Sequence, residues 1–153
     1  MHRLCADARC PLPLTAQVAV GDKGAANAAR LGAAACGDGS IVLLALDAPA
    51  AGKAAASWAL SRAAGGHTAS ASHVAFPAFA DGAPLLLSAG NDGAALLWDW
   101  GAYVAGDAPA PTVAARTLHG TKVNWAASAA APTPRLFIAD TSHQLAVYDV
   151  RLG

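Results

Sequence analysis

Three side chains in the middle of the chain are of the types that carry out acyl transfer. Ser88, His67 and Asp92 have the chemistry of a nucleophile, a general base and an orienting carboxylate. The serine, however, lies in the run Leu87-Ser88-Ala89, and no G-x-S-x-G elbow surrounds it. Nothing nearby offers an oxyanion hole. A Ser-His-Asp hydrolase is therefore only an alternative interpretation, and we expect no catalytic residues and no enzyme.

Sites for phosphate or metal are also not indicated by the sequence. A P-loop after the apolar run 41–46 needs Gly at position 47 and Ser or Thr at position 54, but the chain has Asp47 and Ala54. The five histidines and three cysteines show no His-x-x-x-His or Cys-x-x-Cys pairing. We expect no cofactor and no bound metal.

The elements that hold Ser88, His67 and Asp92 are predicted from the stretch 66–99. It contains three apolar runs, 74–76, 85–88 and 94–98, separated by turn residues. Asp92-Gly93 lies between the second and third runs, and an Asp-Gly between two β-type runs is a strong hairpin signal because both residues tolerate positive φ. We therefore expect these two runs to pair as antiparallel strands.

The same order of runs and turns recurs on both sides of this stretch. Before it, Asp38-Gly39 separates two apolar runs in the same way, and after it two runs flank the turn 141–143. The additional predicted strands are residues 15–20, 30–36, 41–46, 58–60, 112–118, 135–140 and 145–148, and the segment 119–125 leads the last unit. Repetition at about 50 residues indicates a repeat architecture built from β-sheets.

The unit that opens with Gly66-His67 and closes with Trp98-Asp99 resembles a blade of the WD40-repeat family. This resemblance implies an all-β fold of about three four-stranded antiparallel β-propeller blades in an incomplete ring, the last without its outer strand. It also implies that Asp92, His67, Ser88 and Trp98 form a hydrogen-bonded structural tetrad. In the first unit the tetrad is degenerate, and Leu44 takes the place of Trp98.

The resemblance divides the chain into an irregular lead-in, residues 1–14, and a partial WD40 propeller, residues 15–153. The blades are expected at about 15–65, 66–118 and 119–153, with loops at 48–53 and 101–111. A WD40 propeller normally has about seven blades. We therefore expect this chain to be part of a longer protein, or a truncated propeller fragment without independent function.

The composition excludes several classes of partner. Ten basic and ten acidic residues give a net charge of zero, so direct nucleic-acid binding is not indicated. No run of 18 apolar residues is present, so no membrane partner is expected. The first residues lack the continuous apolar region of a signal peptide, and cytoplasm or nucleus is the default expectation.

One motif points to a specific role. Tyr148-Asp149-Val150-Arg151 matches the [W/Y]-D-x-R box of WD40 proteins, which in the family marks substrate receptors of cullin 4 RING ubiquitin ligases. There the arginine contacts the damaged-DNA-binding adaptor, and a guanidinium is a good interface anchor. The resemblance thus implies a non-catalytic protein-interaction scaffold, with Arg151, Asp149 and Tyr148 as partner-binding residues. A solvated arginine at a strand end is the alternative.

Overall fold

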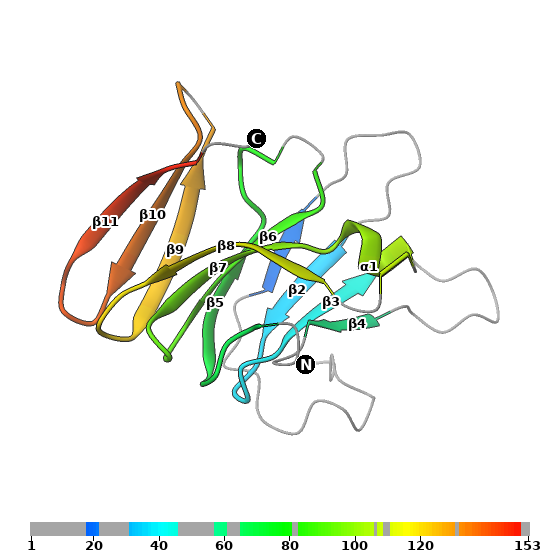
Figure 1. Cartoon of the computed structure of the whole chain (residues 1–153), viewed down its shortest axis with the longest axis horizontal. Coiled ribbons are helices and arrows are strands. Elements are labelled where there is room, and N and C mark those ends of the chain that lie inside the picture. The colour runs from blue at the N-terminus through cyan, green and yellow to red at the C-terminus, as the bar shows by residue number, and fades with distance from the viewer. Residues whose placement is uncertain are drawn as a thin grey trace.

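The computed structural model describes residues 18–21, 31–45, 57–60, 65–80, 83–105, 107–108, 111–130 and 132–150. Within these ranges the chain forms three antiparallel sheets that lie beside one another like the blades of a fan (Figure 1). The predicted all-β architecture is confirmed. No helix within the described ranges is long and apolar enough to cross a membrane.

The first sheet has four strands in sequential order. These are β1 (Val18–Gly21), β2 (Leu31–Ala35), β3 (Ile41–Ala45) and β4 (Ser57–Leu60). The backbone of Leu44 pairs with Gly32 and Ser57. The burial expected for the Leu44 side chain lies outside what the structure describes.

The second sheet carries the residues that opened the sequence analysis. Its strands are β5 (Ala71–Ala75), β6 (Leu85–Gly90), β7 (Ala94–Asp99) and β8 (Thr112–Leu118), again in sequential order. Both middle strands are buried along nearly their whole length, because each side of this sheet faces another sheet. The predicted hairpin at Asp92-Gly93 joins β6 to β7.

A short helix, α1 (Gly101–Ala105), interrupts the segment that the sequence analysis treated as a loop. The Asp99 carboxylate accepts a hydrogen bond from the Gly101 amide at 3.0 Å, as an N-terminal capping residue does. This cap allows one turn of helix to form in an alanine-containing stretch where a loop was expected from the sequence.

The third sheet has three strands within the described residues, β9 (Val123–Ala129), β10 (Arg135–Asp140) and β11 (Leu145–Asp149). Its hairpin between β10 and β11 has the same length as the hairpins of the other two sheets. Counted from the last paired residue of the incoming strand, the fourth residue has positive φ in each case: 88° at Gly39, 77° at Gly93 and 65° at His143. The repeat is therefore preserved in backbone conformation even where the residue is not glycine.

Two apolar cores lie between adjacent sheets. The first joins Ile41 and Leu43 of the first sheet to Leu86, Leu96 and Trp98 of the second. The second core lies between the second and third sheets and includes Leu87, Leu97, Val123, Leu136 and Ile138.

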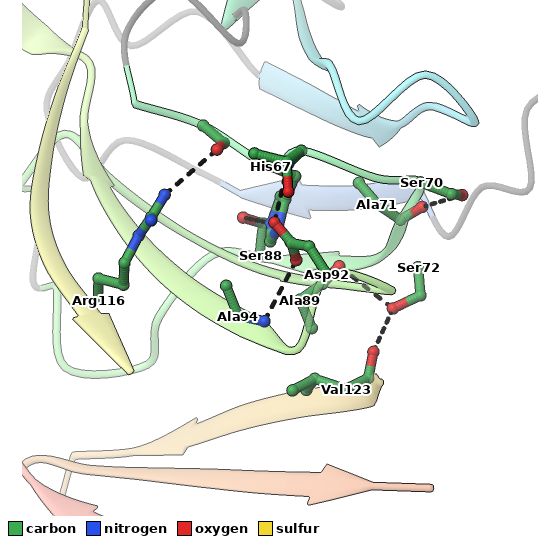
Figure 2. Close-up of polar contacts among 12 residues, drawn as sticks. His67, Ser70, Ala71, Ser72, Ser88, Ala89, Asp92, Ala94, Arg116 and Val123 are labelled. Atoms are coloured by element: carbon green, nitrogen blue, oxygen red, sulfur yellow. Dashed lines mark hydrogen bonds and ion pairs between the residues drawn. The ribbon is translucent and has the colours of Figure 1, made fainter. Parts of the chain in front are cut away.

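Polar contacts add to the second core. The Ser72 hydroxyl of β5 donates to the Val123 carbonyl at 2.6 Å (Figure 2). The Ala78 amide donates to the Ser128 hydroxyl at 2.7 Å. The second and third sheets are thus joined by side-chain packing together with hydrogen bonds.

Candidate functional site

All four residues of the expected tetrad meet at the second sheet (Figure 2 shows His67, Ser88 and Asp92). His67 comes from the loop before β5, Ser88 from the middle of β6, Asp92 from the β6–β7 turn and Trp98 from β7. His67 Nδ1 lies 2.9 Å from Asp92 Oδ1, and His67 Nε2 lies 2.8 Å from Ser88 Oγ. Trp98 Nε1 donates to Ser88 Oγ at 2.8 Å.

The chemistry of the two end groups fixes the direction of these bonds. The Trp98 indole can only donate, and the ionised Asp92 carboxylate can only accept. With neutral His67, Nδ1–H donates to Asp92 and Nε2 accepts the Ser88 hydroxyl proton. Each hydrogen bond in the series Trp98–Ser88–His67–Asp92 is therefore donated in the direction of the carboxylate. Every polar atom that links two of these side chains has a hydrogen-bond partner. We call these four side chains the polar clasp.

Backbone groups complete the coordination of the carboxylate. The Thr68 amide donates to Asp92 Oδ2 at 2.9 Å, and the Ala94 amide donates to Oδ1 at 3.2 Å. Arg116 of β8 donates to the carbonyls of Gly65 and Gly66, at 2.5 and 3.2 Å, and so fixes the loop that carries His67 (Figure 2). The sequence analysis did not identify Arg116, and no motif signals it.

The electrostatics of the clasp follow from its burial. Desolvation lowers the pKa of His67 even though Asp92 opposes the shift, so the imidazole is neutral at pH 7. Burial acts to raise the pKa of Asp92, but the donors from Thr68 and His67 outweigh it and the net pKa is lowered. The clasp thus holds a neutral imidazole against an ionised carboxylate.

Access to the hydroxyl is closed. His67, Ser88 and Trp98 each have 0% of their surface exposed, although the Ser–His and His–Asp distances are those of a hydrolase triad. The indole Nε1–H of Trp98 also takes up one of the hydrogen-bonding positions of Ser88 Oγ. The arrangement can transmit hydrogen bonds across the sheet, but it presents no nucleophile to solvent.

The position of Gly90 explains how the clasp fits together. A Cβ atom at residue 90 would lie under 3.0 Å from both His67 Nδ1 and Asp92 Oδ1. Real Cβ atoms do not approach polar atoms so closely, so a side chain here displaces one of the two partners. Glycine at this position is required by the close approach of His67 to Asp92.

The third sheet has a looser version of the clasp, which the sequence analysis missed. When the two hairpins are aligned by their strand pairing, Asp140 corresponds to Gly90 and Ser142 corresponds to Asp92. His119 Nδ1 is 3.7 Å from Asp140 Oδ2, and the Tyr148 hydroxyl is 3.3 Å from His119 Nε2. His119 precedes β9 by the same number of residues as His67 precedes β5, and this spacing was the available signal.

In this version Asp140 is held mainly by its own turn. Its Oδ1 accepts from the Ser142 hydroxyl at 2.6 Å, from the Ser142 amide at 2.9 Å and from the Gln144 amide at 3.2 Å. The Ser142 hydroxyl bond is the main cause of a lowered pKa at Asp140. The first sheet shows a similar local arrangement, because both Ser40 donors reach Asp38 Oδ1, at 2.6 and 2.9 Å.

Two of the three residues expected to bind a partner, Tyr148 and Asp149, lie at the end of β11. Tyr148 is partly buried and packs against the second apolar core. Asp149 is exposed and accepts a hydrogen bond from Arg135 Nε at 3.0 Å. Arg151 lies outside the described residues. Within the described ranges, no group of three or more His, Cys, Asp or Glu side chains could hold a metal ion.

Comparisons with known proteins support the fold. No protein-family model matches the chain, and no curated protein matches it in sequence. Among solved structures it is similar to Sqt1 of Saccharomyces cerevisiae, a WD40-repeat protein, with a TM-score of 0.51 and 15% sequence identity. The match covers 90% of this chain and 37% of Sqt1. The fold of this chain is therefore that of part of a WD40 propeller.

Proposed function

We propose that the chain acts as a non-catalytic protein-interaction scaffold, with the polar clasp as a structural element. The observation that supports this most directly is the complete burial of Ser88 and His67 between the indole of Trp98 and the carboxylate of Asp92. A hydrolase needs its nucleophile to face a cleft. The propeller fold supplies rigid strands whose loops and edges are available to partners.

An activity-based probe tests the non-catalytic role. The protein is incubated with a serine-reactive fluorophosphonate, and labelling is measured with wild type and with Ser88→Ala. We expect no labelling of either, because the hydroxyl has no access to solvent. Labelling of wild type that disappears in Ser88→Ala contradicts the proposal.

A more specific role is that of a substrate receptor of a cullin 4 RING ubiquitin ligase. Three stretches, 66–99, 119–125 and 136–150, resemble the C-terminal part of WD repeat-containing protein 53. The receptor role itself is suggested by Tyr148-Asp149-Val150-Arg151, which matches the [W/Y]-D-x-R box of WD40 proteins. In support, Tyr148 is anchored inward by the core and by His119, while Asp149 is exposed at the edge of the sheet. The box thus combines a fixed aromatic residue with the exposed carboxylate of Asp149.

Arg151→Ala tests the receptor role. If Arg151 is an interface anchor, its truncation weakens capture of the damaged-DNA-binding adaptor by about thirty-fold or more. The matched control is Lys122→Ala, which removes an exposed positive charge at the opposite end of the third sheet from Asp149 and does not touch the box. Equal binding by wild type and Arg151→Ala, or no binding by either, removes the ligase role and leaves a scaffold with another partner.

A further inference from the structure

A single threonine of the chain stands directly before a proline. Thr133-Pro134 lies in the connection between β9 and β10, and no other serine or threonine in the 153-residue sequence is followed by proline. A serine or threonine before proline is the pattern that proline-directed protein kinases recognise, because their substrate groove selects a residue without a backbone N–H at the next position. The dipeptide therefore makes Thr133 a candidate acceptor of a phosphoryl group.

The structure leaves this threonine open to a kinase. Pro132, Thr133 and Arg135 are all exposed, and residues 132–134 project beyond the end of the third sheet (Figure 1). The sheets of this chain pack against one another through their faces rather than through this end. Packing of a further sheet against a face of the third sheet is therefore compatible with access to Thr133.

The backbone at Thr133 lies between two strands. β9 ends at Ala129 and β10 begins at Arg135, so Thr133 takes no part in the strand pairing. Proline disfavours the helical region for the residue before it and favours an extended one, which is the form in which protein kinases bind an acceptor residue. Binding in a kinase groove also requires the start of β10 to open, and the ends of such elements open at a low free energy.

The position of Arg135 provides a partner for a phosphate on Thr133. The two residues are separated by Pro134, and side chains two residues apart lie on the same side of an extended segment. Arg135 Nε donates to Asp149 Oδ1 at 3.0 Å, and both side chains of this ion pair are exposed. Exposed ion pairs are weak, whereas a phosphate offers a guanidinium more charge and two acceptor oxygens at once. The phosphate can therefore compete with Asp149 for Arg135.

We propose that Thr133 is phosphorylated by a proline-directed protein kinase, and that the phosphate then binds Arg135 in place of Asp149. In the reaction, Thr133 Oγ1 forms a bond to the γ-phosphorus of ATP, the bond from that phosphorus to the β–γ bridging oxygen breaks, and ADP leaves. The hydroxyl proton passes to the catalytic aspartate of the kinase.

The modification changes the charge beside the box Tyr148-Asp149-Val150-Arg151. The Val150 amide donates to the Pro134 carbonyl at 2.9 Å, and Asp149 pairs with Arg135 between β11 and β10. A phosphate on Thr133 therefore adds about two negative charges next to two residues of the box and releases the carboxylate of Asp149. Its consequence for partner binding rests on the proposed receptor role, whereas phosphorylation of Thr133 does not.

Phosphorylation of the folded chain with ATP and either a purified mitogen-activated or a cyclin-dependent protein kinase tests the acceptor site. We expect a single phosphate, located at Thr133 by mass spectrometry of the digested protein. Thr133→Ala and Pro134→Ala should each lower incorporation by at least about ten-fold. The matched control is Thr112→Ala, which should leave incorporation unchanged, because exposed Thr112 has its proline before it and not after it. Circular dichroism shows whether the variants remain folded.

Phosphorus NMR of the modified chain tests the role of Arg135. A guanidinium beside the phosphate favours its dianion, so the second pKa of the phosphothreonine should be lower in wild type than in phosphorylated Arg135→Gln. Equal pKa values in the two proteins overturn the contact with Arg135.

The acceptor site is overturned by three results. These are no incorporation into the folded chain with either kinase, incorporation at another residue, and equal incorporation into wild type and Pro134→Ala. None of the measurements includes the adaptor, so their outcome is independent of whether the box binds it.

Discussion

The second and third sheets both place an aspartate and an aromatic side chain near a histidine, but only the second connects them into a continuous series of hydrogen bonds. In the second sheet the three side-chain distances are 2.8, 2.8 and 2.9 Å. In the third sheet the corresponding contacts of His119 are 3.3 Å to the Tyr148 hydroxyl and 3.7 Å to Asp140. The difference shows that an aspartate and an aromatic residue near a histidine do not by themselves make the clasp.

Two positions account for the difference. Ser88, which links the indole to His67, is replaced in the third sheet by Ile138, so that the longer reach of a tyrosine hydroxyl has to meet the histidine directly. Gly90, which leaves room for His67 and Asp92 to approach, is replaced by Asp140. Moving the carboxylate to that position directs it into its own turn, where Ser142 and Gln144 donate to it.

The largest expected effect on stability comes from removing the aromatic residue next to the histidine in the second sheet, compared with the same change in the third. Trp98→Ala should lower the free energy of unfolding by about 3–5 kcal/mol, because it empties a fully buried site and leaves Ser88 without its donor. Tyr148→Ala should cost at least about 1 kcal/mol less, since Tyr148 is only partly buried. Urea denaturation of both variants measures the two losses. Equal losses of unfolding free energy would mean that the polar clasp stabilises the protein no more than the looser arrangement around His119 does.

A smaller effect is expected from adding one methyl group to the second sheet. Gly90→Ala should destabilise the protein by about 1–3 kcal/mol, because its Cβ displaces His67 or Asp92. Gly120→Ala is the control, since a Cβ at that glycine meets no atom within 4 Å. If both substitutions have the same small effect in denaturant melts, close packing around Gly90 is not what shapes the clasp.

The smallest effect is a dependence on pH that comes from the second sheet. Burial lowers the pKa of His67, and it also lowers the pKa of His73 on β5. Below about pH 6.5, the ordinary histidine pKa, the unfolded chain therefore binds protons that these histidines do not bind in the folded state. The free energy of unfolding should fall as the pH decreases through this range, by at most about 1.4 kcal/mol per pH unit for each histidine.

His67→Gln should remove the contribution of His67 to this slope and leave that of His73. A second decline is expected at lower pH, because the pKa values of Asp92 and Asp140 are both lowered in the folded protein. The stability they provide is present above the ordinary aspartate pKa of 3.8 and is lost as the pH falls through their folded values. Urea melts at half-unit pH steps measure both declines. An unchanged slope between pH 5 and 6.5 in His67→Gln contradicts this assignment.

Much of the fold followed from local signals in the sequence. The Asp-Gly turns at residues 38–39 and 92–93 and the apolar runs around them placed the central hairpins, because turn chemistry and strand pattern agreed. The helix α1 was missed because its cap, Asp99, is also the last residue of β7. Asp140 was missed because its turn lacks glycine, although His143 adopts the same positive φ. Arg116 could not be found, since its role depends on a contact with Gly65 and Gly66 across the sheet.

Exchange of the indole N–H protons measures most directly whether the clasp is a buried structural element. Trp98 Nε1 donates to Ser88 and is fully buried, whereas Trp125 of the third sheet is 43% exposed and serves as an internal control. The account predicts that in D₂O the Trp98 indole proton exchanges at least about a thousand-fold more slowly than that of Trp125, because its exchange requires the sheet to unfold. Exchange of both protons at similar rates would mean that the clasp opens in the folded protein and exposes Ser88, which contradicts a structural role.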